Sequence, residues 1–166
     1  MKQWKLFTIV GFFFVLICGT LLHFVYEWTN QCYVTGLFAP VNESVWEHMK
    51  LVFFPMLFYS VIAIWRIKER HSCVISGLCF GILVGTWCIP ALYYAYTFIL
   101  GRNVFFLDLT IFVISAGIAF YLTGKLALSC RLQPYTVLLC CLVCVLFVCF
   151  LVFSYHPPAL SIFAEP

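Results

Sequence analysis

Long apolar runs alternate with short polar stretches along the whole chain, and this pattern predicts its secondary structure. Each run has about 19 or more residues, enough to cross roughly 30 Å of hydrocarbon as a helix that rises about 1.5 Å per residue. The expected spans are residues 6–26, 43–65, 72–100, 104–122 and 135–155. We therefore predict an all-α integral membrane bundle of about five transmembrane helices, with residues 1–166 forming a single domain.

Two of these spans depart from a simple apolar helix. The third carries Gly85 and Pro90, and because proline interrupts helical hydrogen bonding we expect a kink, or six spans if the helix breaks there. The strongly apolar part of the second span, residues 51–65, is too short to cross alone. Its helix must therefore begin near Glu43, which places the preceding polar residues at the membrane boundary.

Composition supports the membrane assignment and limits the partners. Apolar residues make up 65% of the chain and charged residues 9%, which leaves little sequence for a soluble domain. The net charge of +3 comes from basic residues scattered in ones and twos around the apolar runs, so we expect no nucleic-acid partner. The lipid bilayer is the expected partner, together with a second copy or another membrane protein.

Lysine and arginine predict the orientation, because cytoplasmic loops are enriched in them. With the N-terminus inside, seven basic residues are cytoplasmic: Lys2, Lys5, Arg66, Lys68, Arg70, Lys125 and Arg131. Only Lys50 and Arg102 are then outside, and the C-terminus is external. The run after Lys5 has no small-residue cleavage site, so we expect the first span to be retained rather than removed as a signal peptide.

This orientation gathers the polar residues of the spans near the outer membrane face. They are His23, Glu27, Asn42, Glu43, Glu47, His48, Asp108 and His156. Imidazole and carboxylate groups are ligands for a divalent metal such as zinc, which lowers the pKa of a bound water to about 7. The ligand set we expect is His23 or Glu27 from the first span, His48 from the second and Asp108 from the fourth. Glu47, His48 and Asp108 are the candidate catalytic residues, with Glu47 as general base.

Structural roles compete with these assignments. Asn42, Glu43 and Ser44 suit capping of the second helix, and Ser44 with Glu47 fits a capping box. Glu47 and Lys50 at i and i+3 suit an ordinary surface salt bridge. Asp108 has four alternative partners: Tyr93, Tyr94, Tyr96 and Arg102. His23 and Glu27 also suit a plain interfacial role, and His156 a solvated loop.

No enzyme motif is present in the sequence. It lacks the His-Glu-x-x-His spacing of zinc proteases, a Glu-Glu-x-x-x-Arg box and a Gly-x-Ser-Gly serine site. Cys141 and Cys144 have the C-x-x-C spacing seen in membrane thiol oxidoreductases. They lie in a run of Leu, Val and Phe, where cysteine behaves as a small apolar residue, so we favour a structural role.

Small residues predict close helix packing in the third and fourth spans. They are Gly77, Gly81, Gly85, Ala116, Gly117 and Ala119. Such residues let transmembrane helices approach closely. The contacts they make are either intramolecular or between two copies of the chain.

Several segments together resemble an uncharacterised family of small bacterial multi-pass membrane proteins. The resemblance rests on the box from Gly36 to His48, which contains Leu-Phe-Ala-Pro-Val-Asn-Glu-Ser-Val-Trp-Glu-His, and on shorter matches at residues 90–97, 99–103, 108 and 155–158. It covers most of the chain. It implies a compact helical bundle in a bacterial plasma membrane and supplies no reaction, substrate or cofactor.

Two functional classes follow from the outward polar site. We favour a non-enzymatic protein of the bacterial inner membrane that acts in transport, sensing or partner binding. The alternative is a metal-dependent, membrane-embedded hydrolase that acts on a lipid or peptide at the outer leaflet. The sequence places the same polar residues at the centre of either interpretation.

Overall fold

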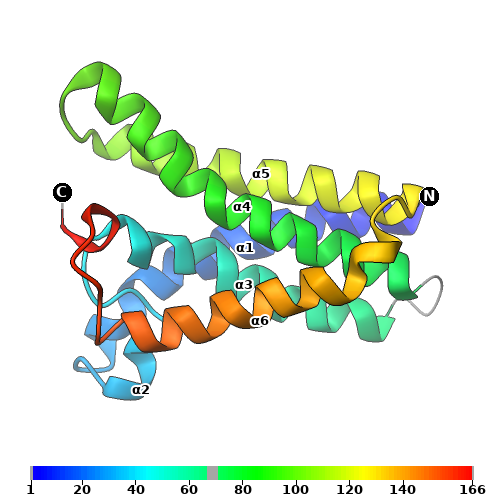
Figure 1. Ribbon diagram of the computed structural model, residues 1–166, viewed down its shortest axis with the longest axis horizontal. Coiled ribbons are helices and arrows are strands. Elements are labelled where there is room, and N and C mark those ends of the chain that lie inside the picture. Colours follow the sequence, from blue (N-terminus) through cyan, green and yellow to red (C-terminus); the bar gives the residue numbers. More distant parts are fainter. Residues whose placement is uncertain (1, 67–70, 166) are drawn as a thin grey trace.

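The computed structural model describes residues 2–66 and 71–165, and within them the chain forms a bundle of five long helices (Figure 1). They are α1 (Lys2–Trp28), α3 (Val45–Arg66), α4 (His71–Leu100), α5 (Phe105–Ser129) and α6 (Thr136–Phe153). Each is long and apolar enough to cross a membrane, and no strand occurs in the described ranges. The all-α prediction with five spans is confirmed.

Three short elements complete the described chain. They are α2 (Tyr33–Gly36) and the 3₁₀-helices η1 (Gln133–Tyr135) and η2 (Ser161–Phe163). The α2 turn lies between α1 and α3, and η1 leads into α6. The η2 turn lies after α6 and packs against α3 through Phe163, whose ring centroid is 4.9 Å from that of Trp46.

The structure decides one alternative for the third span and extends the fourth span. Helix α4 is continuous through Pro90, so it forms one span rather than two. Helix α5 continues past residue 122 to Ser129 because Thr123 and Ala127 are buried within the bundle, although the local sequence is less apolar. Cys130, with a φ of 52°, then ends the helix in the left-handed conformation typical of helix C-termini.

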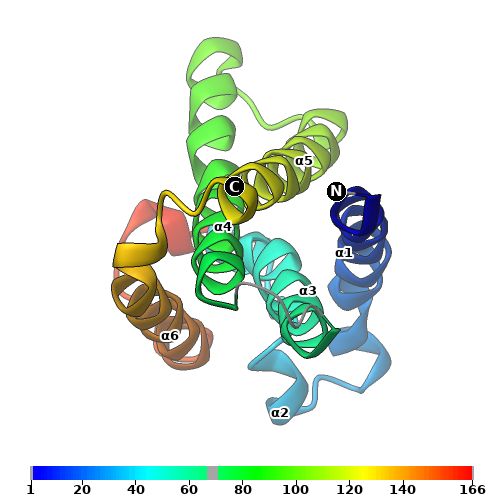
Figure 2. The ribbon, with the colours of Figure 1, turned by 90° about the vertical axis from the view of Figure 1, so that its right-hand side faces the viewer.

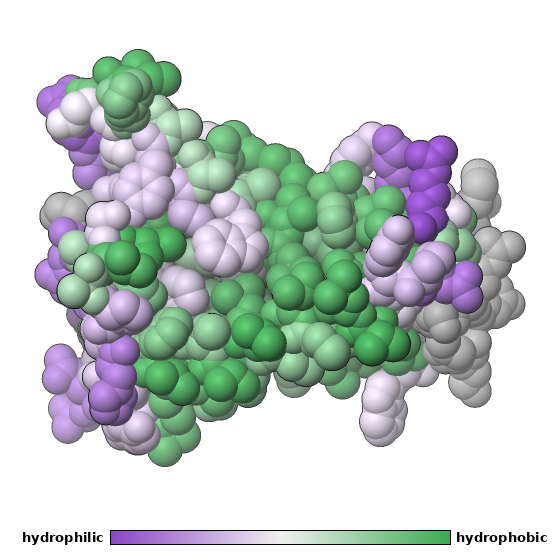
Figure 3. Space-filling model, viewed as in Figure 1, coloured by the Kyte–Doolittle hydropathy of each residue, from purple (hydrophilic) through white to green (hydrophobic). Residues whose placement is uncertain are grey.

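The helices α3 and α4 lie at the centre of the bundle. In the apolar 18-residue segment of each helix, 56% is buried in α3 and 61% in α4, whereas 17% to 33% is buried in the other three helices. In the end-on view α5, α6 and α3 surround α4, and α1 packs on the far side of α3 and α5 (Figure 2). The face of the bundle in Figure 3 is apolar across its middle and polar at both ends, as expected for a protein that crosses a bilayer.

The two ends of the bundle differ in chemistry. One end holds the turns between α1 and α3 and between α4 and α5, together with the C-terminal segment, and we call it the site end (Figure 1). The other end holds the start of α1 and the connection from α5 to α6. We call it the basic end because Lys5, Lys125 and Arg131 lie there. The two termini thus lie at opposite ends of the bundle.

Glycines on α4 bring this helix unusually close to α5. A Cβ atom built on Gly77 would lie 2.8 Å from the backbone nitrogen of Ala127, and one on Gly81 would lie 2.8 Å from the carbonyl oxygen of Ala119. Both distances are too short for a real side chain. The stripe Gly77, Gly81 and Gly85 therefore packs within the chain, one of the two alternatives that the sequence left open.

Replacing Gly81 with alanine tests this packing. The new methyl group would overlap the Thr123 hydroxyl and the α5 backbone, so we expect Gly81→Ala to destabilise the detergent-solubilised protein by about 1–3 kcal/mol. Gly117→Ala is the matched control, because its Cβ would meet only Phe12 at an ordinary 3.8 Å. Thermal unfolding followed by circular dichroism measures both. Equal midpoints for the two variants would contradict close α4–α5 packing.

Candidate metal centre

A tight turn after α1 returns the chain toward the bundle and positions the site. Asn30 and Gln31 have φ angles of 55° and 57°, a left-handed pair that reverses the chain direction. The hydroxyl groups of Thr29 and Thr35 lie 2.7 Å apart and connect the end of α1 to α2. The following segment, residues 37–44, then leads across the site end to α3.

A buried ion pair anchors this segment to the bundle. The Nζ atom of Lys50 lies 2.6 Å from Oε2 of Glu47, and the two side chains are 0% and 2% exposed. Lys50 also donates hydrogen bonds to the carbonyl oxygens of Gly36 (3.0 Å) and Ala39 (3.3 Å) and to Oγ of Ser154 (2.6 Å). One ammonium group therefore joins α3 to α2, to the residue 37–44 segment and to the end of α6.

This arrangement corrects the expectation of a surface salt bridge. The Glu47–Lys50 pair forms as its i, i+3 spacing predicted, but it is buried rather than exposed. Oε2 of Glu47 also accepts a hydrogen bond from the backbone nitrogen of Val41 at 2.9 Å. Because Glu47 is enclosed by these contacts and lies outside the histidine cluster, its predicted role as a general base gains no supporting contact.

Asn42 and Ser44 lie directly before α3, and each accepts a hydrogen bond from a nearby backbone nitrogen. Oδ1 of Asn42 accepts a hydrogen bond from the Ser44 nitrogen at 3.0 Å, and Oγ of Ser44 lies 3.4 Å from the Glu47 nitrogen. The reciprocal half of the capping box does not form, because Glu47 turns to Lys50 instead. Glu43 has a different environment from its two neighbours, since its carboxylate faces two imidazole rings.

Three side chains converge at the site end: His23 of α1, Glu43 of the segment before α3, and His48 of α3. Oε1 of Glu43 lies 3.7 Å from Nε2 of His23, and Oε2 lies 3.4 Å from Nε2 of His48. The two imidazole ring centroids are 5.5 Å apart. The side chain of Glu43 is 65% exposed and those of His23 and His48 are 27% and 31% exposed, so the cluster is reached from outside.

The hydrogen bonding of His48 determines what its second nitrogen offers. Nδ1 lies 2.9 Å from the carbonyl oxygen of Ser44, and because a carbonyl only accepts hydrogen bonds, Nδ1 carries the proton. A neutral His48 therefore directs a lone pair from Nε2 toward the Glu43 carboxylate. Two acceptors facing each other repel, so the geometry is favourable only when a cation, either a proton or a metal ion, lies between them.

The state of Glu43 is consistent with a cation at this position. The hydrogen bond with His48 is the main cause that holds the pKa of Glu43 below its usual value, and the charges of His48 and His23 act in the same direction. Partial burial opposes the shift without reversing it. Glu43 therefore presents an ionised carboxylate at neutral pH.

Asp108 and Glu27 lie outside this cluster. Asp108, in the first turn of α5, accepts a hydrogen bond of 2.6 Å from the Tyr96 hydroxyl, one of the partners that the sequence suggested. Within the described residues, 2–66 and 71–165, no ion pair joins Asp108 to Arg102. Asp108 is close enough to His48 for an electrostatic interaction. Glu27 is exposed on the last turns of α1.

The structure brings together a group of possible metal ligands that overlaps only in part with the predicted set. His23 and His48 lie in this group, whereas Glu43 rather than Asp108 supplies the carboxylate, and Glu27, the predicted alternative to His23, lies outside it. One donor atom from each of the three residues lies within 4.8 Å of the others. Its position before α3 had favoured a capping role for Glu43. The available signal was that the Ser44 side chain can cap α3 without it.

Two imidazoles and one carboxylate form a donor set that fits zinc. Zinc sites that bind water or substrate commonly have three protein ligands and one open position. Metal-bound histidines usually donate their other ring N–H to a carbonyl or carboxylate, as His48 does to Ser44. The residues present therefore fit a divalent transition metal ion, with His23, Glu43 and His48 as its ligands.

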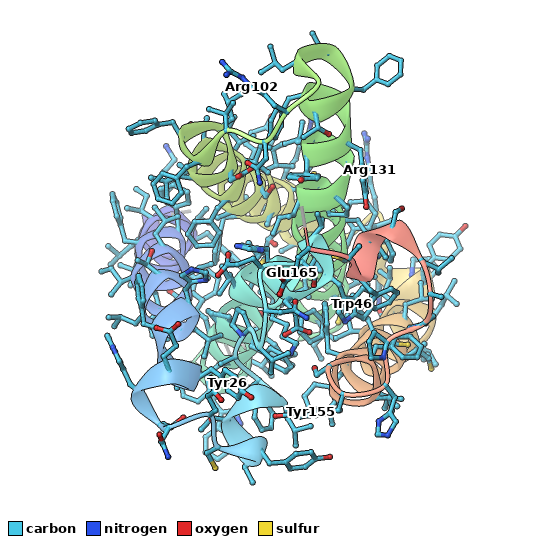
Figure 4. The ribbon with its side chains drawn as sticks, turned by 90° about the vertical axis from the view of Figure 1, so that its left-hand side faces the viewer. Tyr26, Trp46, Arg102, Arg131, Tyr155 and Glu165 are labelled. Carbon is cyan, nitrogen blue, oxygen red and sulfur yellow. A yellow bond between two sulfur atoms is a disulfide. The ribbon has the colours of Figure 1, made fainter. Side chains whose placement is uncertain are left out.

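Two tyrosines connect the chain after α6 to α2 at the site end. Figure 4 looks onto this end, where Tyr155, which follows α6, lies near α2. The Tyr155 hydroxyl donates a hydrogen bond to the carbonyl oxygen of Tyr33 at 3.0 Å, and the two rings stack with centroids 4.4 Å apart. Burial, with a smaller contribution from Tyr26, raises the pKa of Tyr155 to about 12, so this donor keeps its proton.

Comparison with known proteins places the chain in a family but assigns it no activity. The chain belongs to a family of unknown function, DUF6512, whose model matches residues 1–166. No curated protein and no solved structure matches the chain. This membership fits the resemblance to an uncharacterised family. It supplies no reaction, so the geometry of the site is the basis for a proposed function.

Lys50 provides a test of how the site is held. Replacing Lys50 with methionine leaves the buried Glu47 carboxylate without its cation, and we expect a loss of about 3–5 kcal/mol in stability. The double variant Glu47→Gln, Lys50→Met removes both charges and is expected to recover a large part of this loss. Thermal unfolding in detergent compares the two. A double variant less stable than Lys50→Met alone would contradict the buried ion pair.

Proposed function

We propose that this chain, from a family without an assigned activity, is a multi-pass membrane protein that binds a divalent transition metal ion such as zinc at His23, Glu43 and His48. The observation that carries the proposal is the convergence of two imidazole nitrogens on one carboxylate, 3.4 Å and 3.7 Å from its oxygens. A metal ion satisfies all three groups at once. A single proton satisfies only one imidazole–carboxylate contact.

The side chains of the cluster can orient toward one metal ion, and this supports metal binding. Zinc ligands lie about 2.0–2.2 Å from the ion, so the three groups must orient toward a common centre. Glu43 is suited to this movement, because it lies in the segment before α3 and its side chain is 65% exposed. His48 is the fixed ligand, since the Ser44 carbonyl holds its ring.

Binding is favoured over hydrolysis because Glu47 and Asp108, the two carboxylates predicted to be catalytic, are engaged by other residues. The predicted base, Glu47, is 2% exposed and is held by Lys50 and Val41. The carboxylate of Asp108 is engaged by Tyr96 at 2.6 Å. A metal hydrolase needs a base within reach of the metal-bound water. The site therefore supports transport, sensing or partner binding better than it supports the hydrolase alternative.

A sensing role fits the origin of the ligands, which come from two helices rather than one. His23 lies on α1, whereas His48 lies on the central helix α3. These helices already pack together, and the Tyr59 hydroxyl donates a hydrogen bond of 2.9 Å to the carbonyl oxygen of Phe7. Metal occupancy would add a link between them at the site end, and a second copy or another membrane protein would respond to that change.

The proposed orientation exposes the site to the outside of a bacterial inner membrane. Lys5, Lys125 and Arg131 lie at the basic end, which the positive-inside rule assigns to the cytoplasm. The N-terminus is then cytoplasmic and the C-terminus external. The metal site, at the opposite end, receives ions from the external compartment.

Metal analysis of untagged, detergent-purified protein tests the proposal. We expect about one zinc ion per folded chain after zinc loading and desalting, and we expect His23→Ala, Glu43→Gln and His48→Ala each to weaken binding by at least about tenfold. Elemental analysis and competition with a zinc indicator measure stoichiometry and affinity, and circular dichroism verifies the fold.

Three further substitutions make this test specific. His156→Ala removes an exposed histidine at the same end of the bundle and is expected to leave zinc binding unchanged. Glu27→Gln and Asp108→Asn test the ligand set predicted from sequence. Folded wild-type protein that binds no zinc, or zinc lost from Glu27→Gln but retained in Glu43→Gln, would contradict the proposed site.

A further inference from the structure

Cysteines connect α4 to its neighbours in two different chemical states. Cys73, in the first turn of α4, forms a disulfide with Cys130, which follows α5. Farther along α4, Sγ of Cys79 lies 3.7 Å from Sγ of Cys140 on α6, and both are free thiols. The disulfide joins residues 57 apart in sequence, so neither its partners nor its presence followed from a local cysteine motif.

The disulfide lies at the basic end of the bundle. Cys130 is followed directly by Arg131, and Lys125 lies in the last part of α5. Under the orientation proposed above, this end faces the cytoplasm. Disulfides are rare in that compartment, and those that do form are usually transient, catalytic or redox-sensing. The position of this bond therefore argues against a purely structural disulfide.

The two sulfur atoms differ in access. Cys73 is 6% exposed and packs within the bundle, whereas Cys130 is partly exposed in the connection between α5 and η1. A reductant from solution would therefore reach the bond on the Cys130 side. The cysteine pair of α4 and α6 is different, because Cys79 is only 9% exposed and lies farther into the apolar helix than Cys73.

We infer that Cys73 and Cys130 form a thiol–disulfide exchange site that reacts with dithiol reductants of the cytoplasm. A thiolate of the reductant attacks the disulfide, and a mixed disulfide forms while one protein thiolate leaves. The second thiol of the reductant then breaks the mixed disulfide. In sum the protein accepts two electrons and two protons and carries two thiols, and the reductant becomes a disulfide.

Reduction releases a tether without dismantling the bundle. The close contact of Gly77 with the Ala127 backbone lies one turn from Cys73 and does not depend on the disulfide. The α5–η1 connection, by contrast, is fixed to α4 by the Cys73–Cys130 bond. The exchange site thus controls how firmly the basic end of α4 is joined to α5. It is independent of metal binding at the opposite end.

Differential alkylation of the full-length protein in native membrane vesicles tests this inference. Vesicles equilibrated with mixtures of reduced and oxidised dithiothreitol are quenched with acid, and free thiols are alkylated with a light reagent. Disulfides are then reduced and alkylated with a heavy reagent, and mass spectrometry reads each cysteine separately. We expect Cys73 and Cys130 to change together, with the reduced-to-oxidised ratio shifting about tenfold for each ~30 mV of ambient potential.

Variants and whole cells complete the experiment. Cys73→Ser is expected to leave Cys130 reduced at every potential, whereas Cys79→Ser, the control on the same helix, is expected to leave the transition unchanged. In living cells, a thiol oxidant should raise the disulfide fraction and a permeant dithiol should lower it. Cysteines that stay fully oxidised or fully reduced under all these conditions, or that titrate independently, would overturn the inference. The redox titration of the wild-type protein tests the inference by itself, even if the Cys73→Ser variant fails to accumulate.

Discussion

The buried ion pair of Glu47 and Lys50 organises the end of the bundle on which the proposed function depends. A charged ammonium group inside a membrane protein requires compensation, and Lys50 obtains it from the Glu47 carboxylate, two carbonyl groups of residues 36–39 and the Ser154 hydroxyl. These contacts bring together α3, the segment that follows α2, and the end of α6. They fix the path of residues 37–44, and this path places Glu43 between the imidazoles of α1 and α3.

The cluster of His23, Glu43 and His48 follows from that framework. The Ser44 carbonyl holds the His48 ring, so a neutral Nε2 turns a lone pair toward an ionised carboxylate. A second imidazole approaches the same carboxylate from α1. The two carboxylates predicted to be catalytic have other partners, since Glu47 is held by Lys50 and Asp108 by Tyr96. The arrangement thus offers three groups that could hold a cation, and it supports the proposal of binding better than that of hydrolysis.

The sequence predicted the fold well because the length and apolarity of each run decide how often a chain crosses a bilayer. It predicted the polar site less well. Helical spacing put Glu47 and His48 in the same turn, but spacing does not reveal that Lys50 meets Ser154, 104 residues away, and thereby encloses Glu47. Glu43 was assigned to capping because it precedes a helix, although the adjacent Ser44 contacts the Glu47 nitrogen in that role. The Cys73–Cys130 disulfide was missed for the same reason, since it depends on how α4 and α5 pack rather than on a local motif.

X-ray absorption spectroscopy at the zinc edge of the zinc-loaded wild-type protein tests the central claim most directly, because it identifies the ligand atoms. The account predicts a first shell of nitrogen and oxygen atoms at about 2.0–2.2 Å, with the outer-shell scattering of two imidazole rings. A shell of sulfur atoms at about 2.3 Å would show instead that cysteines hold the metal. That result would contradict the assignment of His23, Glu43 and His48 as the cation site.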